Sequence, residues 1–244
     1  MHVQKLVSEL NRLYLMPGVL TPERLDAQLR DPHAAPIPLT DAGGHGRALA
    51  IPFRSQPGGG DGHWTRLCAL ANALQSDYGF APPAVSVSGT DGFDLWLSLD
   101  QPVARALRDE FVARLRQAEL VDDALDGSNP VLPPCALGGA DKWSAFIHPD
   151  LGASFADEPW LEMAPPPSGQ TALLSGLRSI GTDTFTQALA TLRAAQDGVG
   201  APVASAPAAP VTSGGLLLAD ATLEDIVRHL HAKHIEPTFR HLIP

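Results

Sequence analysis

The side chains that could hold a metal or move a proton are spread along this 244-residue chain and form no dense motif. The closest group is His229, His231 and His234, near the C-terminus. On a helix His231 and His234 share one face while His229 points away, and zinc sites need three or four converging ligands. We therefore predict no metal site and no cofactor.

The three glycines Gly58–Gly60 are a second candidate, because glycine-rich loops can cradle a phosphate. Such a loop also needs a Lys-Ser or Lys-Thr pair after it, and none follows here, so flexibility explains the glycines. His45, Asp61 and His63 flank the run and are candidate metal ligands, but we expect them to be solvated loop residues.

Composition and charge are typical of a folded, acidic protein. Hydrophobic residues make up 44% of the chain, and no apolar run reaches the about 20 residues that cross a bilayer. The net charge is −10, whereas a duplex-DNA binder normally carries a basic face. Cys68 and Cys135 form no disulfide framework, and the N-terminus lacks a signal-peptide pattern. We expect a cytoplasmic protein without membrane association.

The spacing of apolar residues predicts helices and strands of an α+β fold. Helices are expected at residues 3–14, from a cap at Thr21 onward, and at 64–75, 103–120, 170–179 and 183–195. Strands are expected at 48–53, 84–88, 93–99 and 143–148. The turn Gly89-Thr90-Asp91-Gly92 predicts that the second and third strands form a hairpin.

These elements predict four parts in the chain: N-terminal helices (1–30), a main domain (31–195), a flexible linker (196–215) and a helical tail (216–244). The linker is predicted from its Ala, Pro, Gly and Ser composition. The tail helix has an apolar stripe that we expect to pack on a protein partner, and it consists of Leu223, Ile226, Val227 and Leu230.

Residues 84–103, AVSVSGTDGFDLWLSLDQPV, resemble the central motif of the archaeo-eukaryotic primases and primase-polymerases. That motif has a serine-glycine turn, a histidine, a hydrophobic strand with a tryptophan, and an aspartate-proline exit. The strand ALAIPFR resembles the first motif region. The downstream segment from LPPCALGG to LLSGLRSI resembles the third, and it is closest to primase domains of mobile-element conflict systems. The resemblance spans about residues 45–180. It implies a primase-like RRM-type sheet platform with flanking helices.

The resemblance also implies that the catalytic residues are replaced. The family's first-motif aspartates fall on Pro52 and Arg54, its central histidine on Asp94, and its third-motif aspartate on His148. The family's carboxylates hold two divalent cations, which arginine would repel, and Asp94 would repel the phosphates of a nucleotide. Two-metal nucleotidyl transfer is therefore predicted to be absent. The four residues are predicted to converge on one face of the sheet, since strand residues two apart share a face.

Several of these residues have more than one interpretation. Asp94 and His148, expected on adjacent strands, are either a hydrogen-bonded pair or remnant cation site, or a polar pair that fills a disused cleft. Ser88 and Lys142 are candidate contacts to a nucleotide or a nucleic acid. Trp160, in a proline-rich segment, is a candidate anchor for a protein partner.

The sequence thus predicts a catalytically degenerate primase-like accessory or scaffold protein. It would serve DNA replication, maintenance or conflict functions of a mobile element or defence locus, with a protein partner and with nucleic acid only through a local patch. One alternative is a divergent active primase or polymerase with relocated carboxylates, namely Asp61, Asp91, Asp94 and Asp150. A second is an acidic interaction protein that inhibits a nucleic-acid-binding partner.

Overall fold

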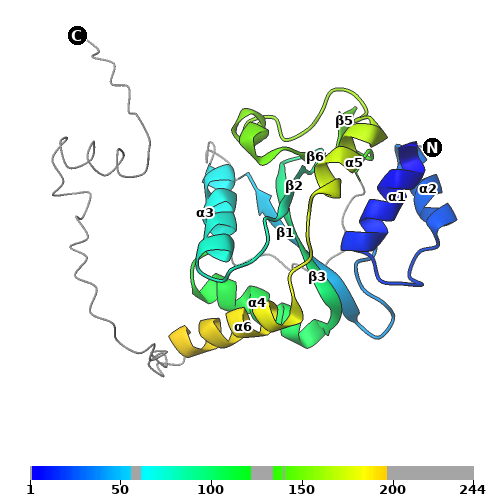
Figure 1. The fold of residues 1–244 in the computed structure, drawn as a ribbon. Helices are drawn as coiled ribbons and strands as arrows, with labels where there is room; N and C mark the ends of the chain where they lie inside the picture. Colours follow the sequence, from blue (N-terminus) through cyan, green and yellow to red (C-terminus); the bar gives the residue numbers. More distant parts are fainter. Residues whose placement is uncertain (1, 56–61, 122–133, 140, 197–244) are drawn as a thin grey trace, which may run out of the picture. The chain divides into compact units, whose positions relative to one another are not determined.

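The computed structural model describes residues 2–55, 62–121, 134–139 and 141–196 (Figure 1). The glycine run with Asp61, the linker from residue 197, and the tail with its stripe and its histidines lie outside these described residues. The helices are α1(His2–Leu13), α2(Pro22–Arg30), α3(Gly62–Ser76), α4(Arg105–Gln117), η1(Pro149–Phe155), α5(Pro167–Ser175) and α6(Thr182–Gln196). The strands are β1(His45–Arg54), β2(Ala84–Val87), β3(Gly92–Ala104), β4(Leu137–Gly139), β5(Lys142–Trp143) and β6(Ala145–Ile147).

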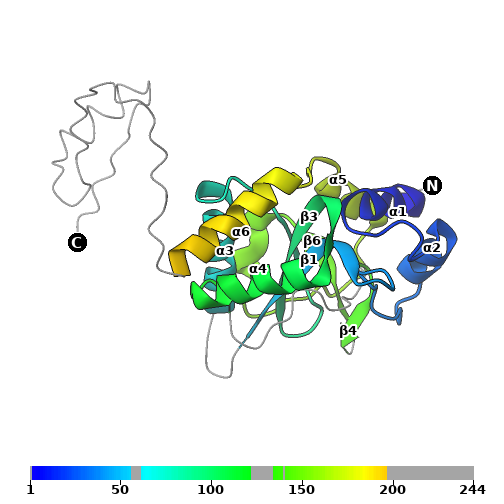
Figure 2. The same ribbon diagram turned by 90° about the horizontal axis from the view of Figure 1, so that it is seen from below.

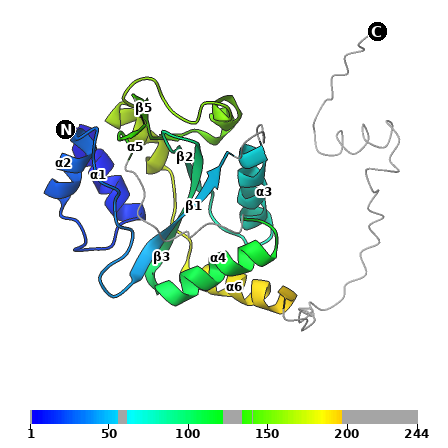
Figure 3. The same cartoon turned by 180° about the vertical axis from the view of Figure 1, so that it is seen from behind.

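One antiparallel sheet has the strand order β1-β3-β2-β6, and β4 and β5 form a second, two-stranded sheet. β1 and β3 lie side by side through the middle of the molecule (Figure 3). Their pairing runs from His45 and Ala104 to Arg54 and Gly92, with a bulge between Gly46 and Ala48. The expected α+β class and the β2–β3 hairpin are confirmed.

Alternation along the strands gives the large sheet two apolar faces, each covered by helices (Figure 2). Ile51, Phe53 and Leu95 belong to the core shared with α3, α4 and α6. Ala50 and Trp96 belong to the core on the opposite face, shared with α1, α2 and α5. Helices far apart in sequence therefore pack on one sheet. None of the helices in the described ranges is long and apolar enough to cross a membrane.

The structure corrects two strand predictions. β3 continues to Ala104, beyond the predicted end at residue 99, because its last residues pair with β1 past the bulge. The strand predicted at 143–148 is divided between β5 and β6 around Ser144, whose N–H donates to the Ala136 carbonyl and draws the chain away from a straight path. The helices expected before residue 196 are found, with ends shifted by a few residues, whereas the expected tail helix lies outside the described residues.

Arg108 of α4 is fully buried, although the sequence gives no sign of it. Its guanidinium donates to the carbonyls of Gly44, Ala48 and Val103, where β1 bulges against β3. A Cβ atom on Gly46 would lie 2.7 Å from the Leu39 carbonyl oxygen and 2.8 Å from Arg108 Nη1. The glycine therefore makes room for the arginine, which ties α4 to the sheet.

Gln170 of α5 completes the edge strand β6. Its amide accepts the Phe146 N–H at 2.7 Å and donates to the Phe146 carbonyl at 3.1 Å, and its side chain is buried. These are the two backbone groups that a further strand would pair. One side chain thus satisfies polar groups that burial would otherwise leave unpaired.

Replacing Gln170 with leucine is expected to lower the free energy of unfolding by about 2–4 kcal/mol, because it leaves a buried N–H and a buried carbonyl unpaired. Urea unfolding followed by circular dichroism measures the change. Gln187→Leu on the exposed face of α6 is the matched control and should cost less than about 0.5 kcal/mol. Equal small losses in both variants would contradict the role given to Gln170.

Candidate functional site

The register of β1 and β3 brings together three of the four positions at which the resemblance to primases implies replaced catalytic residues. Pro52 lies directly opposite Asp94, and Arg54, two residues further along β1, shares their face. Arg54 Nη2 lies 2.7 Å from Asp94 Oδ1, and Arg54 Nη1 donates to the Phe93 carbonyl at 2.6 Å. The predicted convergence holds for these three residues.

Pro52 sits where a proline does least harm to the sheet. β1 is an edge strand among the described strands, and the hydrogen bond from the Ser55 N–H to the Asp91 carbonyl sets which groups of β1 face β3. Alternation then directs the nitrogen of Pro52 away from β3, where no ladder bond is lost. The residue adds no ligand to the site.

Arg54 and Asp94 form a largely buried ion pair. The Asp94 side chain is 11% exposed and that of Arg54 is 34% exposed. Burial raises the pKa of Asp94 above its ordinary value, while the nearby charge and hydrogen bond of Arg54 act in the opposite direction. Asp91, whose Oδ1 lies 3.4 Å from Arg54 Nε, adds a smaller upward effect on the Asp94 pKa.

This arrangement disfavours a divalent cation beside Asp94. The guanidinium occupies the carboxylate's near side, and a second positive charge within a few ångströms would be repelled at low dielectric. A guanidinium also cannot give up its proton to become a ligand. The pair can hold strands together, but it offers no metal-binding set.

The space beside Asp94 is a cavity of about 10 Å³, lined in part by Ser86, Ser88, Ser144 and Trp96. That volume holds about one water molecule. Pockets for small-molecule ligands usually measure about 300–1,000 Å³. The cavity bounded by the described residues is therefore too small for a nucleotide.

Ser88, a candidate contact to nucleotide, has its hydroxyl committed to the turn that follows β2. Its Oγ accepts the N–H groups of Thr90, Asp91 and Gly92 at 3.1–3.2 Å, and the side chain is buried. The turn is also covered from outside. The Gly89 N–H donates to the Pro159 carbonyl.

Gly138 packs against the same turn from β4. A Cβ atom there would lie 2.7 Å from the Ser88 and Gly89 carbonyl oxygens. The glycine therefore permits a close approach of two backbones, which no local sequence pattern signals. The serine-glycine turn is closed over by neighbouring chain rather than open to a ligand.

Lys142 and Trp160, predicted for two different roles, contact each other. The Lys142 ammonium lies 3.2 Å from the centroid of the Trp160 ring, a cation–π contact. Trp160 Nε1 also donates to Glu162. Two backbone hydrogen bonds between Trp143 and Leu161 hold the segments together. Both side chains are half-buried.

His148 does not join the other three residues. β2 lies between β3 and β6, so the expectation of adjacent strands for Asp94 and His148 is wrong. Extending the β2–β6 register by one residue puts His148 opposite Ala84, on the face of Asp94 but two strands away, about 10 Å. His148 is exposed and accepts the Asp150 N–H at 3.3 Å as the cap of η1. A hydrogen-bonded pair with Asp94 is therefore excluded by the strand order.

His63 also departs from its prediction as a solvated loop residue. It lies in the first turn of α3, is 2% exposed, and stacks on Phe93 with ring centroids 5.3 Å apart. Neither ring nitrogen has a hydrogen-bond partner among the described residues. His45 is exposed beside Asp41. Across the described ranges, no three His, Cys, Asp or Glu side chains gather as a metal site.

The cysteines show no sign of activation. Cys135 is buried, and burial raises the pKa of its thiol to about 11. Burial also raises the pKa of Cys68, which is half-buried. A reactive cysteine needs a lowered pKa, and burial shifts the pKa of both thiols in the opposite direction.

Comparison of the sequence with protein-family models and with curated proteins finds no match. The likeness to primases therefore rests on the motif residues discussed above.

Removing the Arg54 charge is expected to destabilise the protein, because it leaves the Asp94 carboxylate buried without a counter-charge. Arg54→Met should cost about 2–3 kcal/mol at pH 7, less than for a fully buried pair because Arg54 is one-third exposed. Arg24→Met, at an exposed position on α2, is the control. Urea unfolding measures both.

The loss of stability caused by Arg54→Met should be larger at neutral pH than at acidic pH. Asp94 has a raised folded-state pKa, so its contribution to stability is present below the unfolded-state pKa and is lost as the pH rises through the folded-state pKa. Without Arg54 that pKa rises further, so the destabilisation should shrink as the pH falls. Adding Asp94→Asn to Arg54→Met should recover part of the loss at pH 7. A pH-independent cost without recovery would contradict the ion-pair account.

Proposed function

We propose that this protein is a catalytically degenerate primase-like accessory or scaffold protein for DNA replication, maintenance or conflict functions of a mobile element or defence locus. The observation that carries the proposal is the ion pair between Arg54 and Asp94 at positions where the family places a metal ligand and a phosphate-binding histidine. A site that once held cations and phosphate is, on this view, filled by a salt bridge.

The order of the elements from β1 to β3 supports this proposal. β1, α3 and the β2–β3 hairpin follow one another as the motif order implies, and the first two motif regions lie on paired strands. β6 adds beside β2, whereas the last strand of an RRM sheet lies beside the first. The RRM-type likeness is therefore proposed for the β1–α3–β2–β3 unit alone.

The closed surroundings of Asp94 support a role without nucleotide chemistry. The cavity of about 10 Å³ and the covered serine-glycine turn leave no room for a triphosphate within the described residues. Of the relocated carboxylates of the alternative enzyme, Asp91 and Asp94 both contact Arg54, and Asp150 lies beside His148. Asp61 lies outside the described residues. A scaffold role needs neither cations nor nucleotide, and it is compatible with an acidic protein.

The full chain is expected to show no primer extension and no primer synthesis with Mg²⁺ or Mn²⁺ and either deoxyribo- or ribonucleotides. The physical reason is that Arg54 stands where a cation would have to bind. Incorporation of radiolabelled nucleotides, resolved on a denaturing gel, measures this, with an active primase-polymerase as the positive control. Incorporation that Asp94→Ala abolishes would overturn the proposal and favour the divergent enzyme.

A further inference from the structure

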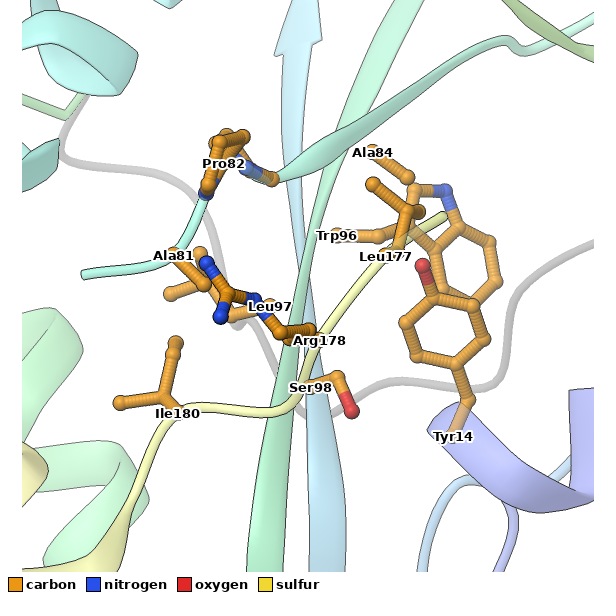
Figure 4. Close-up of a pocket in the computed structure, with 11 residues that line it drawn as sticks. Tyr14, Ala81, Pro82, Ala84, Trp96, Leu97, Ser98, Leu177, Arg178 and Ile180 are labelled. Atoms are coloured by element: carbon orange, nitrogen blue, oxygen red, sulfur yellow. The ribbon is translucent and has the colours of Figure 1, made fainter. Parts of the chain in front are cut away.

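A groove runs over one end of the large sheet, between residues 79–85 and residues 173–184, and we call it the Arg178 groove (Figure 4). It joins three hollows that share lining residues. A hollow of about 260 Å³ is mainly apolar and is lined by Pro83, Ile147, Leu173 and Leu177 among others. A hollow of about 350 Å³ at the other end contains Arg178.

Between them lies a small hollow of about 10 Å³ above Tyr14 and Trp96. Its walls are firmly held. The Ile180 N–H donates to the Ser98 carbonyl, so residues around 180 pair alongside β3, while Pro82 and Pro83 stiffen the chain entering β2. Leu177 and Arg178 point to opposite sides of their segment, Leu177 toward Trp96 and Arg178 toward Ala81 and Pro82 (Figure 4).

Along the groove, Arg178, Ser179 and Tyr14 place hydrogen-bond donors that are unpaired within the described ranges. Arg178 is exposed, and its guanidinium has no hydrogen-bond or ion-pair partner among the described residues. The backbone N–H groups of Arg178 and Ser179 also donate to no described acceptor. The Tyr14 hydroxyl, on a side chain 1% exposed, points between Trp96 and Leu177 without a hydrogen-bond partner in the described chain (Figure 4).

Burial raises the pKa of Tyr14 well above its ordinary value, so its hydroxyl stays neutral and remains a donor. Other arginines of this chain, namely Arg12, Arg30 and Arg193, pair with its carboxylates. The chain has 27 acidic and 17 basic residues, yet no carboxylate of the described ranges pairs with Arg178.

From these features we infer that the Arg178 groove binds an extended peptide segment of a partner protein, with an acidic side chain at Arg178 and an aliphatic side chain between Leu173 and Leu177. The carboxylate complements the guanidinium, and the aliphatic group complements the apolar hollow. The groove is open along its length and its backbone donors suit peptide carbonyls. The inference goes beyond the scaffold role and does not depend on any relation to primases.

The test uses the full chain and an array of short fluorescein-labelled peptides that carry one glutamate and one leucine at every spacing on a Gly-Ser background. We expect saturable binding, measured by fluorescence anisotropy, at one or a few spacings. The same peptide with glutamine for glutamate, or with alanine for leucine, should lose most of the binding. Arg178→Glu should weaken binding at least about tenfold, since it turns a charge-assisted contact into repulsion.

Arg24→Glu makes the same charge change at an exposed site on α2 and should leave binding unchanged. Binding at no spacing, or binding that Arg178→Glu and Arg24→Glu weaken equally, would overturn the inference. Displacement of the peptide by a single-stranded oligonucleotide would assign the groove to nucleic acid instead. Self-association of the chain that Arg178→Glu abolishes would assign it to a second copy. Because no nucleotide incorporation enters this test, its result is independent of the proposed function.

Discussion

Helices cover both faces of the four-stranded sheet, so buried polar groups on the sheet need hydrogen-bond or ionic partners within the protein. The indole N–H of Trp96 donates to Ser86 at 2.8 Å. Gln170 pairs with the backbone at the edge of β6. Arg54 and Asp94 form an ion pair. A carboxylate as buried as Asp94 is tolerated only because a fixed positive charge lies beside it.

The same constraint explains why the candidate site has little chemistry left. Its carboxylate bonds to an arginine, its serine bonds to the turn, and its turn lies under the β4 and Pro159 backbones. Each of these contacts adds to the stability of the folded state and removes a group that could bind a nucleotide. The Arg178 groove differs, because described donors of its lining, on Arg178, Ser179 and Tyr14, have no partner in the described ranges. The candidate site is closed, and the groove is open.

Local patterns predicted most of the elements, because apolar spacing, the Thr21 cap and the Gly89–Gly92 turn act over a few residues. Period-two alternation likewise predicted that Pro52 and Arg54 would face Asp94. The position of β6 beside β2 was not predictable, because strand order depends on packing between distant segments, and the Asp94–His148 pairing failed for that reason. Buried Arg108 and closely packed Gly138 were missed because their neighbours are remote in sequence.

The central claim is that the Arg54 guanidinium occupies the place of a cation. Electron paramagnetic resonance of Mn²⁺ tests it most directly, since the free ion gives a strong signal that binding to a protein weakens. When Mn²⁺ is titrated with the full chain at neutral pH, we expect no ion to bind at a site that requires Asp94. The unchanged chain and the Asp94→Asn variant should therefore leave the same free-ion signal. The account would be contradicted if the chain removed one ion per molecule from solution and Asp94→Asn restored the free-ion signal.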